Sequence, residues 1–178
     1  MKTAETIGAE LAGLIKGTVR IDLCTRTAFS TDASIYHILP QCVVSPRDEQ
    51  DIIAVVSYAA ANQIPVAPRG AGSGLAGESL TSGIVIDCRR FMNAIVDTAP
   101  DGSWVRVQPG VVLDKLNAHL VSFGRKIGPD PSSSNRAVMG GVVANNATGA
   151  HSLQYGYIAD YVDSVRVVLA DGTPVTLS

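Results

Sequence analysis

The chain lacks several features that mark common protein classes. Of its 178 residues, 5% are aromatic and 17% are charged, and the net charge is −2. Without a basic excess, we expect no nucleic-acid partner. No apolar run approaches the ~20 residues of a membrane-spanning helix, so no transmembrane segment is predicted. The first 16 residues carry Glu5 and Glu10 and therefore differ from the apolar region of a signal peptide.

Cysteine is also scarce. Cys24, Cys42 and Cys88 are far apart, and none has the C-x-x-C spacing of a local zinc or iron–sulfur site. We therefore predict no metal site in this chain, and we interpret the three thiols as free and buried or half-buried. Free thiols are typical of a reducing compartment, so a cytoplasmic location is expected. Hydrophobic residues make up 46% of the chain, which is enough for a packed core.

Glycine, in contrast, is concentrated in one loop. Four glycines fall between Gly70 and Gly77, directly after the apolar segment 64–67. Glycine permits a positive φ and a close approach of the backbone to a ligand. Successive N–H groups can then point into a concavity that suits an anion, and Arg69 adds positive charge. The loop predicts a phosphate or pyrophosphate site, and a flexible surface turn is the alternative.

The type of phosphate loop follows from the residues after it. Residues 72–77 match the G-x-G-x-x-G fingerprint, which requires a helix to follow. Here a turn at residues 81–83 and a β-branched run at 84–86 leave no room for a crossover helix. We therefore exclude a Rossmann site. A P-loop is excluded because no Gly-Lys-Ser/Thr follows at the required spacing.

The pattern of the remaining chain predicts an α+β fold with a βαβ-like N-terminal subdomain, followed by a mixed or antiparallel sheet with helices. Ser45 is expected to cap a helix whose first residue is Pro46. His119 is expected to be solvated or at the edge of a core. The apolar stripe of the helix that begins at Pro46 is expected to comprise Ile52, Val55, Val56, Ala59 and Ala60. Other helices are expected at 3–16, with Leu14 on its apolar face, and at 111–123, with Gly124 as the C′ residue. Strands are expected at 41–44, 64–67, 84–87, 95–97, 104–108, 162–169 and 173–177, and a turn at 99–102 joins two of them in a hairpin. Irregular structure is expected at 20–36 and 128–157.

A second segment, residues 129–151, is long for a loop and combines small, hydrogen-bonding and apolar residues. Gly140 and Gly141 would permit close approach to a flat ligand, and Asn145 and Asn146 would offer hydrogen bonds without charge. We expect His151 to contact a ligand by hydrogen bonding or packing rather than to act in catalysis. The alternative is an Ω-type loop that packs on itself.

Together, the two segments resemble the FAD-binding domain of the FAD-linked oxidase family, which has the vanillyl-alcohol oxidase type fold. The resemblance covers residues 39–178 and is carried by 68–75, 131–133, 140–141 and 145–156. Within the family, the chain is most similar to D-2-hydroxyacid dehydrogenases, such as glycolate oxidase, D-lactate dehydrogenase and D-2-hydroxyglutarate dehydrogenase. The sequences of residues 32–36, 39–40 and 144–146 are most similar to those of members with a C-terminal iron–sulfur region.

The resemblance implies non-covalent FAD, because Ser73 and Gly74 stand where members with covalent flavin often have histidine. An iron–sulfur cluster is implied only in a region beyond this chain. Val138 replaces a residue that is often polar in the family, and Glu78 is expected to face solvent. The residues implied to contact FAD are Pro68, Arg69, Gly70, Ala71, Gly72, Ser73, Gly74, Leu75, Pro131, Ser132, Ser133, Gly140, Gly141, Asn145, Asn146, Gly149, Ala150 and His151.

The resemblance also implies an activity for the complete enzyme: oxidation of a D-2-hydroxyacid by hydride transfer to FAD. Residues 1–38 are expected to form an N-terminal helix and extension, and 39–178 an FAD-binding domain that ends before the substrate domain. No catalytic residue is expected in this chain. An electron-acceptor partner and peripheral association with the inner membrane are open for the complete enzyme. Two alternatives are a non-catalytic flavin- or nucleotide-binding module that needs a partner chain, and a flavoenzyme with another substrate, such as an aldonolactone or a cell-wall enolpyruvyl compound.

Overall fold

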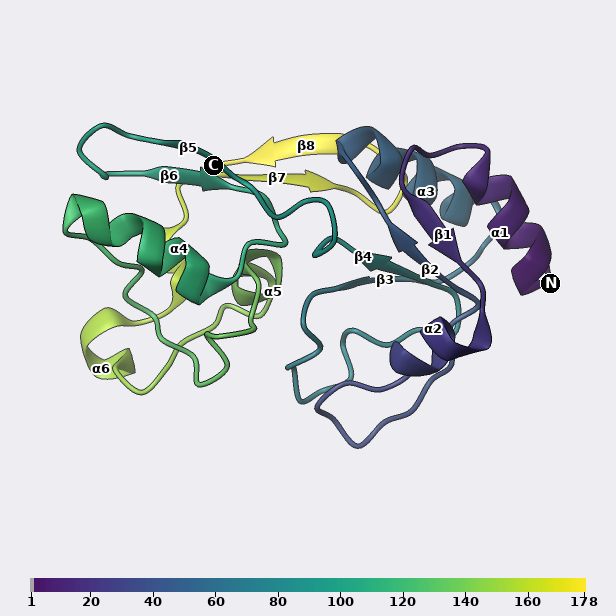
Figure 1. Ribbon diagram of the computed structural model, residues 1–178, viewed down its shortest axis with the longest axis horizontal. Helices are drawn as coiled ribbons and strands as arrows, with labels where there is room; N and C mark the ends of the chain where they lie inside the picture. The colour runs from purple at the N-terminus through teal and green to yellow at the C-terminus, as the bar shows by residue number, and fades with distance from the viewer. Residues whose placement is uncertain (1) are drawn as a thin grey trace. The chain divides into compact units, whose positions relative to one another are not determined.

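The computed structural model describes residues 2–178, which divide into two compact units (Figure 1). The first unit contains the residues up to Phe91 together with Ser164–Ser178, and the second contains Met92–Asp163. The second unit is therefore an insertion in the sequence of the first. Mixed helices and sheets in both units confirm the α+β class.

The first unit is built on a four-stranded sheet in the order β1-β2-β4-β3. Strand β1 is antiparallel to β2, whereas β2, β4 and β3 are parallel. A separate antiparallel hairpin is formed by β7 and β8. The elements are α1 (Ala4–Ala12), β1 (Thr18–Arg20), α2 (Leu23–Ala28), β2 (Cys42–Ser45), α3 (Glu49–Ala61), β3 (Val66–Arg69), β4 (Ile84–Asp87), β7 (Val165–Val168) and β8 (Pro174–Leu177).

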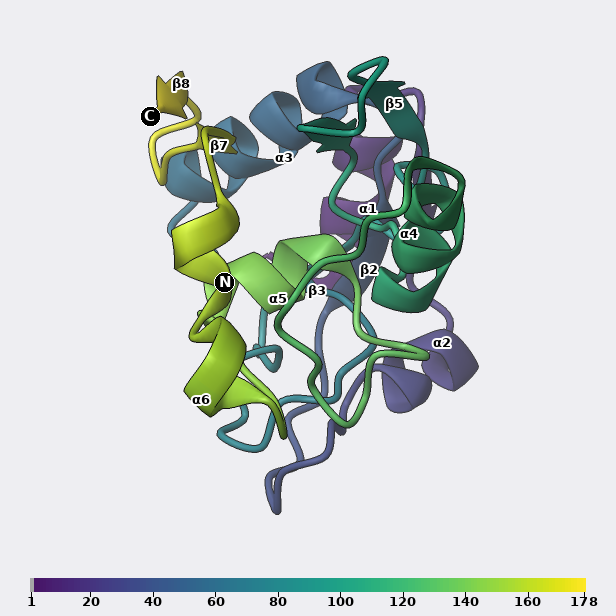
Figure 2. The ribbon, with the colours of Figure 1, turned by 90° about the vertical axis from the view of Figure 1, so that its left-hand side faces the viewer.

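The core of the first unit lies between one face of this sheet and two helices. Alternate residues of β2 and β4 point to that face, because side chains along a strand alternate between the two sides. Helices α1 and α3 cover it, and α2 lies on the opposite side of the sheet (Figures 1 and 2). The buried residues of this core are Ile7, Leu11, Cys42, Val44, Val55, Ala59, Ile84 and Ile86.

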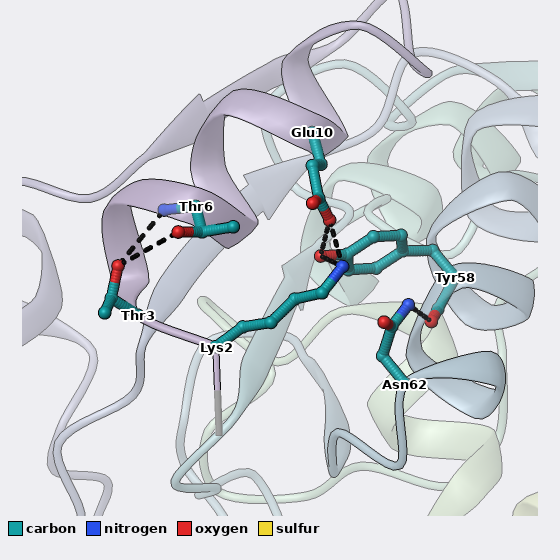
Figure 3. A network of polar contacts seen from close by, with 6 residues as sticks. All are labelled: Lys2, Thr3, Thr6, Glu10, Tyr58 and Asn62. Atoms are coloured by element: carbon teal, nitrogen blue, oxygen red, sulfur yellow. Dashed lines mark hydrogen bonds and ion pairs between the residues drawn. The ribbon is translucent and has the colours of Figure 1, made fainter.

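Helix α1 is tied to α3 by a small polar network (Figure 3). The Tyr58 hydroxyl donates a hydrogen bond to Glu10 at 2.6 Å, and Lys2 forms an ion pair with the same carboxylate. The helix was expected to continue to residue 16 but ends at Ala12. Leu14, which was assigned to its apolar face, is 55% exposed.

The start of α3 differs from the prediction. Ser45 is the last residue of β2 and pairs with Thr18 of β1. Asp48 is the N-cap instead, and its carboxylate accepts a hydrogen bond from the Asp51 amide. Ser45 and Pro46 are both buried. Of the apolar stripe predicted for this helix, Val55 and Ala59 are buried, whereas Ala60 is exposed. Ser45 and Pro46 both precede the helix.

Residues 20–36 were expected to be irregular, yet they contain the end of β1 and all of α2. Asp22 caps α2 by accepting hydrogen bonds from the amide and hydroxyl of Thr25, both at 2.9 Å. These bonds, together with one from Arg20, lower the pKa of Asp22 to about 2. An Asp followed three residues later by Thr was therefore a helix-start signal that the sequence analysis missed.

The second unit packs α4 on the β5–β6 hairpin (Figure 2). The hairpin is antiparallel, as predicted, and α4 ends in a 3₁₀ turn followed by Gly124 at φ +63°. The elements are β5 (Ile95–Thr98), β6 (Val105–Val107), α4 (Leu113–Leu120), η1 (Val121–Phe123), α5 (Met139–Ala144), α6 (Ser152–Tyr155) and η2 (Ile158–Tyr161). Its core residues are Val111, Leu113, Leu116, Leu120, Ala137, Met139, Val142 and Ile158.

Two further expectations fall in this unit. His119 is half-buried and shares a 2.9 Å hydrogen bond with the Thr98 hydroxyl, which confirms the core-edge interpretation. Residues 128–157 were expected to be irregular but contain α5 and α6. Helix α5 begins without a side-chain cap and contains Gly140 and Gly141. The usual helix-start signals are therefore absent from its sequence.

Among residues 2–178, no helix is long and apolar enough to cross a membrane, and no group of three or more potential ligands could hold a metal ion. All three cysteines are free, but Cys24 is exposed, contrary to the expectation of burial. It lies on α2, whose six residues include none that is buried. Burial raises the pKa of Cys42 to about 12 and that of Cys88 to about 11.

These thiols should differ sharply in reactivity, because the thiolate is the reactive form. At pH 8, we expect a thiol reagent such as 5,5′-dithiobis(2-nitrobenzoate) to modify Cys24 within minutes in the folded protein. Cys42 and Cys88 should react only after denaturation. Peptide mapping of the modified chain checks this, and rapid labelling of Cys42 in the native protein would contradict the described core.

Asp51 offers a test of how α3 is attached. Its side chain is buried and accepts hydrogen bonds from the Lys16 and Arg47 amides, each at 2.8 Å. Asp51→Ala leaves both amides without this acceptor and should lower the free energy of unfolding by about 2–4 kcal/mol in urea melts followed by circular dichroism. Gln50→Ala, at the exposed neighbouring position, is the matched control and should change it by about 0.5 kcal/mol or less.

Candidate functional site

The glycine loop connects β3 to β4 without a helix, as predicted. These strands are parallel neighbours, and Arg69 pairs with Asp87 where both strands end. The loop therefore leaves the sheet at the carboxyl end of β3, the edge at which parallel sheets hold ligands. Pro68 and Arg69 end β3, and Leu75 is 79% exposed. Gly70, Ala71, Gly72, Ser73 and Gly74 are half-buried between them.

Arg69 folds back over its own loop. Its guanidinium donates to the Thr31 carbonyl at 2.6 Å and to the Ser79 hydroxyl at 3.4 Å, and it lies 5.3 Å from the centre of the Phe29 ring. A Cβ atom on Gly72, which has φ +68°, would overlap this guanidinium. Glycine is thus required here for two reasons, the backbone conformation and the position of Arg69.

A segment that the site prediction did not include, residues 29–38, supports the loop. The Ala33 amide donates to the Gly72 carbonyl at 3.0 Å, and the Ser79 hydroxyl donates to Asp32 at 3.0 Å. Burial acts to raise the pKa of Asp32, but hydrogen bonds from Ser34 and Ser79 outweigh it and hold this pKa below its ordinary value. The Asp-x-Ser pattern at 32–34, typical of a tight side-chain-capped turn, was the available signal.

Glu78 was expected to face solvent, but its carboxylate folds back onto the glycine loop. Its carboxylate accepts a hydrogen bond from the Ala76 amide at 3.2 Å and lies where a Cβ atom on Gly74 would be. The residue is exposed overall, but its charged end is folded against the glycine loop. The cationic side chain of Arg69 therefore lies against Gly72, and the anionic side chain of Glu78 lies against Gly74.

In the second unit, His151 is held by Asp130. Asp130 accepts hydrogen bonds from the backbone amide of His151 and from its Nδ1 atom, and these bonds lower the pKa of Asp130. A Cβ atom on Gly149 would overlap the Asp130 backbone, so glycine permits this close approach. His151 is exposed, and with Nδ1 engaged, its Nε2 atom remains for another hydrogen bond.

The adjacent glycines of α5 have different surroundings. A Cβ on Gly140 would lie 2.9 Å from Cβ of Pro109, whereas one on Gly141 would meet nothing within 4 Å. Gly140 is thus explained by packing within this unit. Packing does not explain why residue 141 is glycine. A ligand that approaches the backbone of the helix at this position would explain it.

The other predicted residues lie around α5 and the turn before it. Asn145 caps the C-terminus of α5, and Asn146 has φ +45° and accepts a hydrogen bond from the Ala159 amide at 3.1 Å. Pro131, Ser132 and Ser133 form the turn that leads to α5, and Ser133 accepts backbone hydrogen bonds from Arg136 and Ala137. Ala150 is exposed next to His151.

Comparison with known proteins identifies the family. The profile described as "FAD binding domain" matches residues 40–178. The chain belongs to this family. The family model confirms the resemblance that was drawn from the two glycine-rich segments, and FAD is the cofactor that it implies.

Two curated relatives agree with this family assignment. The chain is 43% identical over 150 residues to the D-2-hydroxyglutarate dehydrogenase of Escherichia coli K12, a match that covers 83% of this chain and 15% of the relative. It is 35% identical over 150 residues to the glycolate oxidase subunit GlcD of Bacillus subtilis, over 83% of this chain and 32% of that protein. The chain thus spans about a seventh of the first relative and about a third of the second.

Solved structures show the same fold. An alkyldihydroxyacetonephosphate synthase superposes with a TM-score of 0.86 at 23% identity, over 99% of this chain and 35% of that one. The 6-hydroxy-D-nicotine oxidase of Arthrobacter nicotinovorans gives 0.80 at 24% identity, over 92% and 36%. The expected vanillyl-alcohol oxidase type fold is confirmed.

The paired glycines of α5 provide a test that needs no ligand. Gly140→Ala should destabilise the second unit by about 1–3 kcal/mol, because the new methyl group must displace Pro109. Gly141→Ala should stabilise it by up to about 1 kcal/mol, because alanine favours the helix. Urea denaturation followed by fluorescence of Trp104, the single tryptophan, measures both. Equal effects of the two substitutions would contradict the described packing.

Proposed function

We propose that this chain is the FAD-binding portion of a flavin-dependent dehydrogenase that oxidises a D-2-hydroxyacid of the lactate, glycolate or 2-hydroxyglutarate class. The observation that carries the proposal is the match of residues 40–178 to the FAD binding domain, together with 43% identity to a D-2-hydroxyglutarate dehydrogenase. The substrate, the electron-acceptor partner and a cytoplasmic location belong to the complete enzyme and remain part of this proposal.

The first loop fits a pyrophosphate group. Gly72 has φ +68°, a backbone conformation of the kind that lets neighbouring amides point into one concavity, and the loop lies at the ligand-holding edge of a parallel sheet. Pro68, Arg69, Gly70, Ala71, Ser73, Gly74 and Leu75 complete the segment that we assign to this group. Because the guanidinium of Arg69 already contacts the protein, its part is to hold the loop and to supply positive charge.

The second segment is assigned to the same cofactor. Gly141 leaves the side of α5 open to a flat ring. With Nδ1–H of His151 donating to Asp130, its Nε2 atom can accept a hydrogen bond from an N–H or O–H group of the cofactor, and Asp130 fixes the ring orientation. Pro131, Ser132, Ser133, Gly140, Asn145, Asn146, Gly149 and Ala150 supply the surrounding backbone and hydrogen bonds. When bound, FAD would accept a hydride from the substrate carbon, and these residues orient and bind it.

The domain boundary at residue 39 and the absence of catalytic residues from this chain are part of the same proposal. A flavin-binding module without turnover is the second candidate. The small share of each relative that the chain spans favours it for the isolated polypeptide. Turnover of D-lactate, D-2-hydroxyglutarate or glycolate by this chain alone, with FAD and an artificial electron acceptor, would exclude that candidate.

The cofactor assignment is tested by flavin binding. The purified chain, mixed with FAD and freed of excess, should show the visible absorption of oxidised flavin and release it on denaturation. Gly72→Val should lower FAD affinity at least about tenfold, because a β-branched residue resists φ +68° and collides with Arg69.

The matched control is Gly124→Val. Gly124 also has a positive φ of +63°, but a Cβ there meets nothing within 4 Å, and the residue lies outside both assigned segments. This variant carries a similar backbone strain and should bind FAD like the unmodified chain. Equal loss of FAD from both variants would mean that strain alone, rather than the loop, accounts for the effect.

A further inference from the structure

Two arginines follow strands at the ligand-holding edge of the first unit's sheet and are not part of the cofactor assignment. Arg47 comes after β2 and Arg90 after β4, and these strands are parallel neighbours. Their carboxyl ends therefore meet at the edge where β3 ends and the glycine loop begins. In the strand order, β2 and β3 lie on opposite sides of β4. Both arginine side chains are exposed.

A single aromatic ring contacts both guanidinium groups. Cζ of Arg47 lies 4.4 Å from the centre of the Phe91 ring, and Cζ of Arg90 lies 5.3 Å from the same point. Guanidinium groups stack favourably on aromatic faces. The two groups are no farther apart than the sum of these distances, which is about one Debye length at 0.1 M salt, ~10 Å. The two positive charges therefore repel each other unless an anion lies between them.

Arg47 is held at two further points. Its backbone amide donates to the buried Asp51 carboxylate at 2.8 Å, and its Nε atom donates to the Lys16 carbonyl at 3.2 Å. In the part of the chain that the structure describes, the terminal amino groups of Arg47 have no hydrogen-bond partner, and neither do the side-chain N–H groups of Arg90. Donors that are fixed in place and lack a partner are preorganised for a ligand.

The carboxylates closest in sequence to the two arginines have other partners. Asp48 forms an ion pair with Lys16, and Asp87 forms one with Arg89, both at 2.8 Å. Asp51 is buried and accepts two backbone amides. The sheet edge thus presents two guanidinium groups that make no ion pair with any residue from 2 to 178.

We propose that Arg47 and Arg90, aligned by Phe91, form a binding site for a phosphate group, in addition to the glycine loop. Arginine binds oxyanions through two parallel hydrogen bonds. A phosphate monoester has three outer oxygens and a charge of about −1.5 to −2 at pH 7, so it can engage both arginines at once. A carboxylate has two oxygens and one charge, and a single arginine satisfies it. A free phosphate compound and a phospholipid headgroup share the chemistry that this site recognises.

Titration with inorganic phosphate tests the site. At pH 7.5 and constant ionic strength, the NMR signals of the arginine Nε–H groups report the dissociation constant. Arg90→Gln removes one guanidinium and should weaken phosphate binding about three- to tenfold, as followed on Arg47. Phe91→Leu keeps both charges but removes the ring that aligns them, and it should weaken binding by a similar factor. Acetate should bind to the unmodified chain more weakly than phosphate. Circular dichroism checks that each variant is folded.

Arg106→Gln is the matched control. Arg106 is a single exposed arginine in the second unit, and its Cζ lies 6.0 Å from the centre of the Trp104 ring. The substitution makes the same change in net charge as Arg90→Gln and also removes a cation–π contact. It should leave the dissociation constant for phosphate unchanged, because no second arginine faces that ring in the described chain.

Vesicles distinguish the two sources of the phosphate group. Sedimentation with phosphatidylcholine vesicles that contain phosphatidic acid, but not with phosphatidylcholine alone, would assign the site to a lipid headgroup, provided that Arg90→Gln weakens it and Arg106→Gln does not. Binding of inorganic phosphate without binding to either vesicle would assign the site to a free phosphate compound. Both results support the inference.

The remaining outcomes separate this inference from the proposed function. Equal phosphate affinity of the unmodified chain, Arg90→Gln and Phe91→Leu would overturn it, and so would an equal loss in Arg106→Gln. Loss of phosphate from the arginines when FAD is added would place them in the cofactor site and also overturn it. Gly72→Val should bind phosphate here like the unmodified chain, because the substitution lies in the glycine loop. Failure of FAD binding therefore leaves the inference standing, and failure of phosphate binding leaves the cofactor assignment standing.

Discussion

The first unit depends on one constraint, the parallel pairing of β3 with β4 without a helix between them. Adjacent parallel strands require the chain to return along their full length, and here a glycine-rich loop makes that return. Such a loop has few internal hydrogen bonds of its own and must be held from outside. Residues 29–38 hold it, through the Ala33 amide, the Asp32 carboxylate and the backbone carbonyl of Thr31. The same arrangement keeps the loop at the edge of the sheet where a ligand can reach it.

The loop glycines consequently have two roles that the sequence pattern cannot separate. A glycine in a phosphate-loop pattern suggests room for a ligand, yet Gly72 and Gly74 make room for Arg69 and Glu78 of the same loop. In α5, Gly140 accommodates Pro109, whereas Gly141 faces open space. What a glycine accommodates is decided by residues distant in sequence, such as the Pro109 that meets Gly140.

Sequence reasoning succeeded where a local rule decides the structure. The strand at Ile84–Asp87, the hairpin around residue 101, the helix-free glycine loop and the αL glycine at 124 all follow from local periodicity and turn chemistry.

Sequence reasoning failed where tertiary contacts determine the structure. Ser45 has the chemistry of a helix cap, but pairing with Thr18 keeps it in β2. Helix α5 has glycines and no cap, and buried Met139 and Val142 stabilise it instead. The supporting role of residues 29–38 depends on contacts with residues about 40 positions later, which one sequence does not reveal.

The insertion of one unit in the sequence of the other bears on the order of synthesis. Residues 92–163 are contiguous and contain a complete core, so they can fold as soon as they leave the ribosome. The first unit must wait, because its β7–β8 hairpin is translated after the second unit and attaches to α3 through the ion pair of Arg166 with Glu49. During that interval, α3 lacks this contact. Of the two units, the one whose translation begins earlier is thus the one that is completed later.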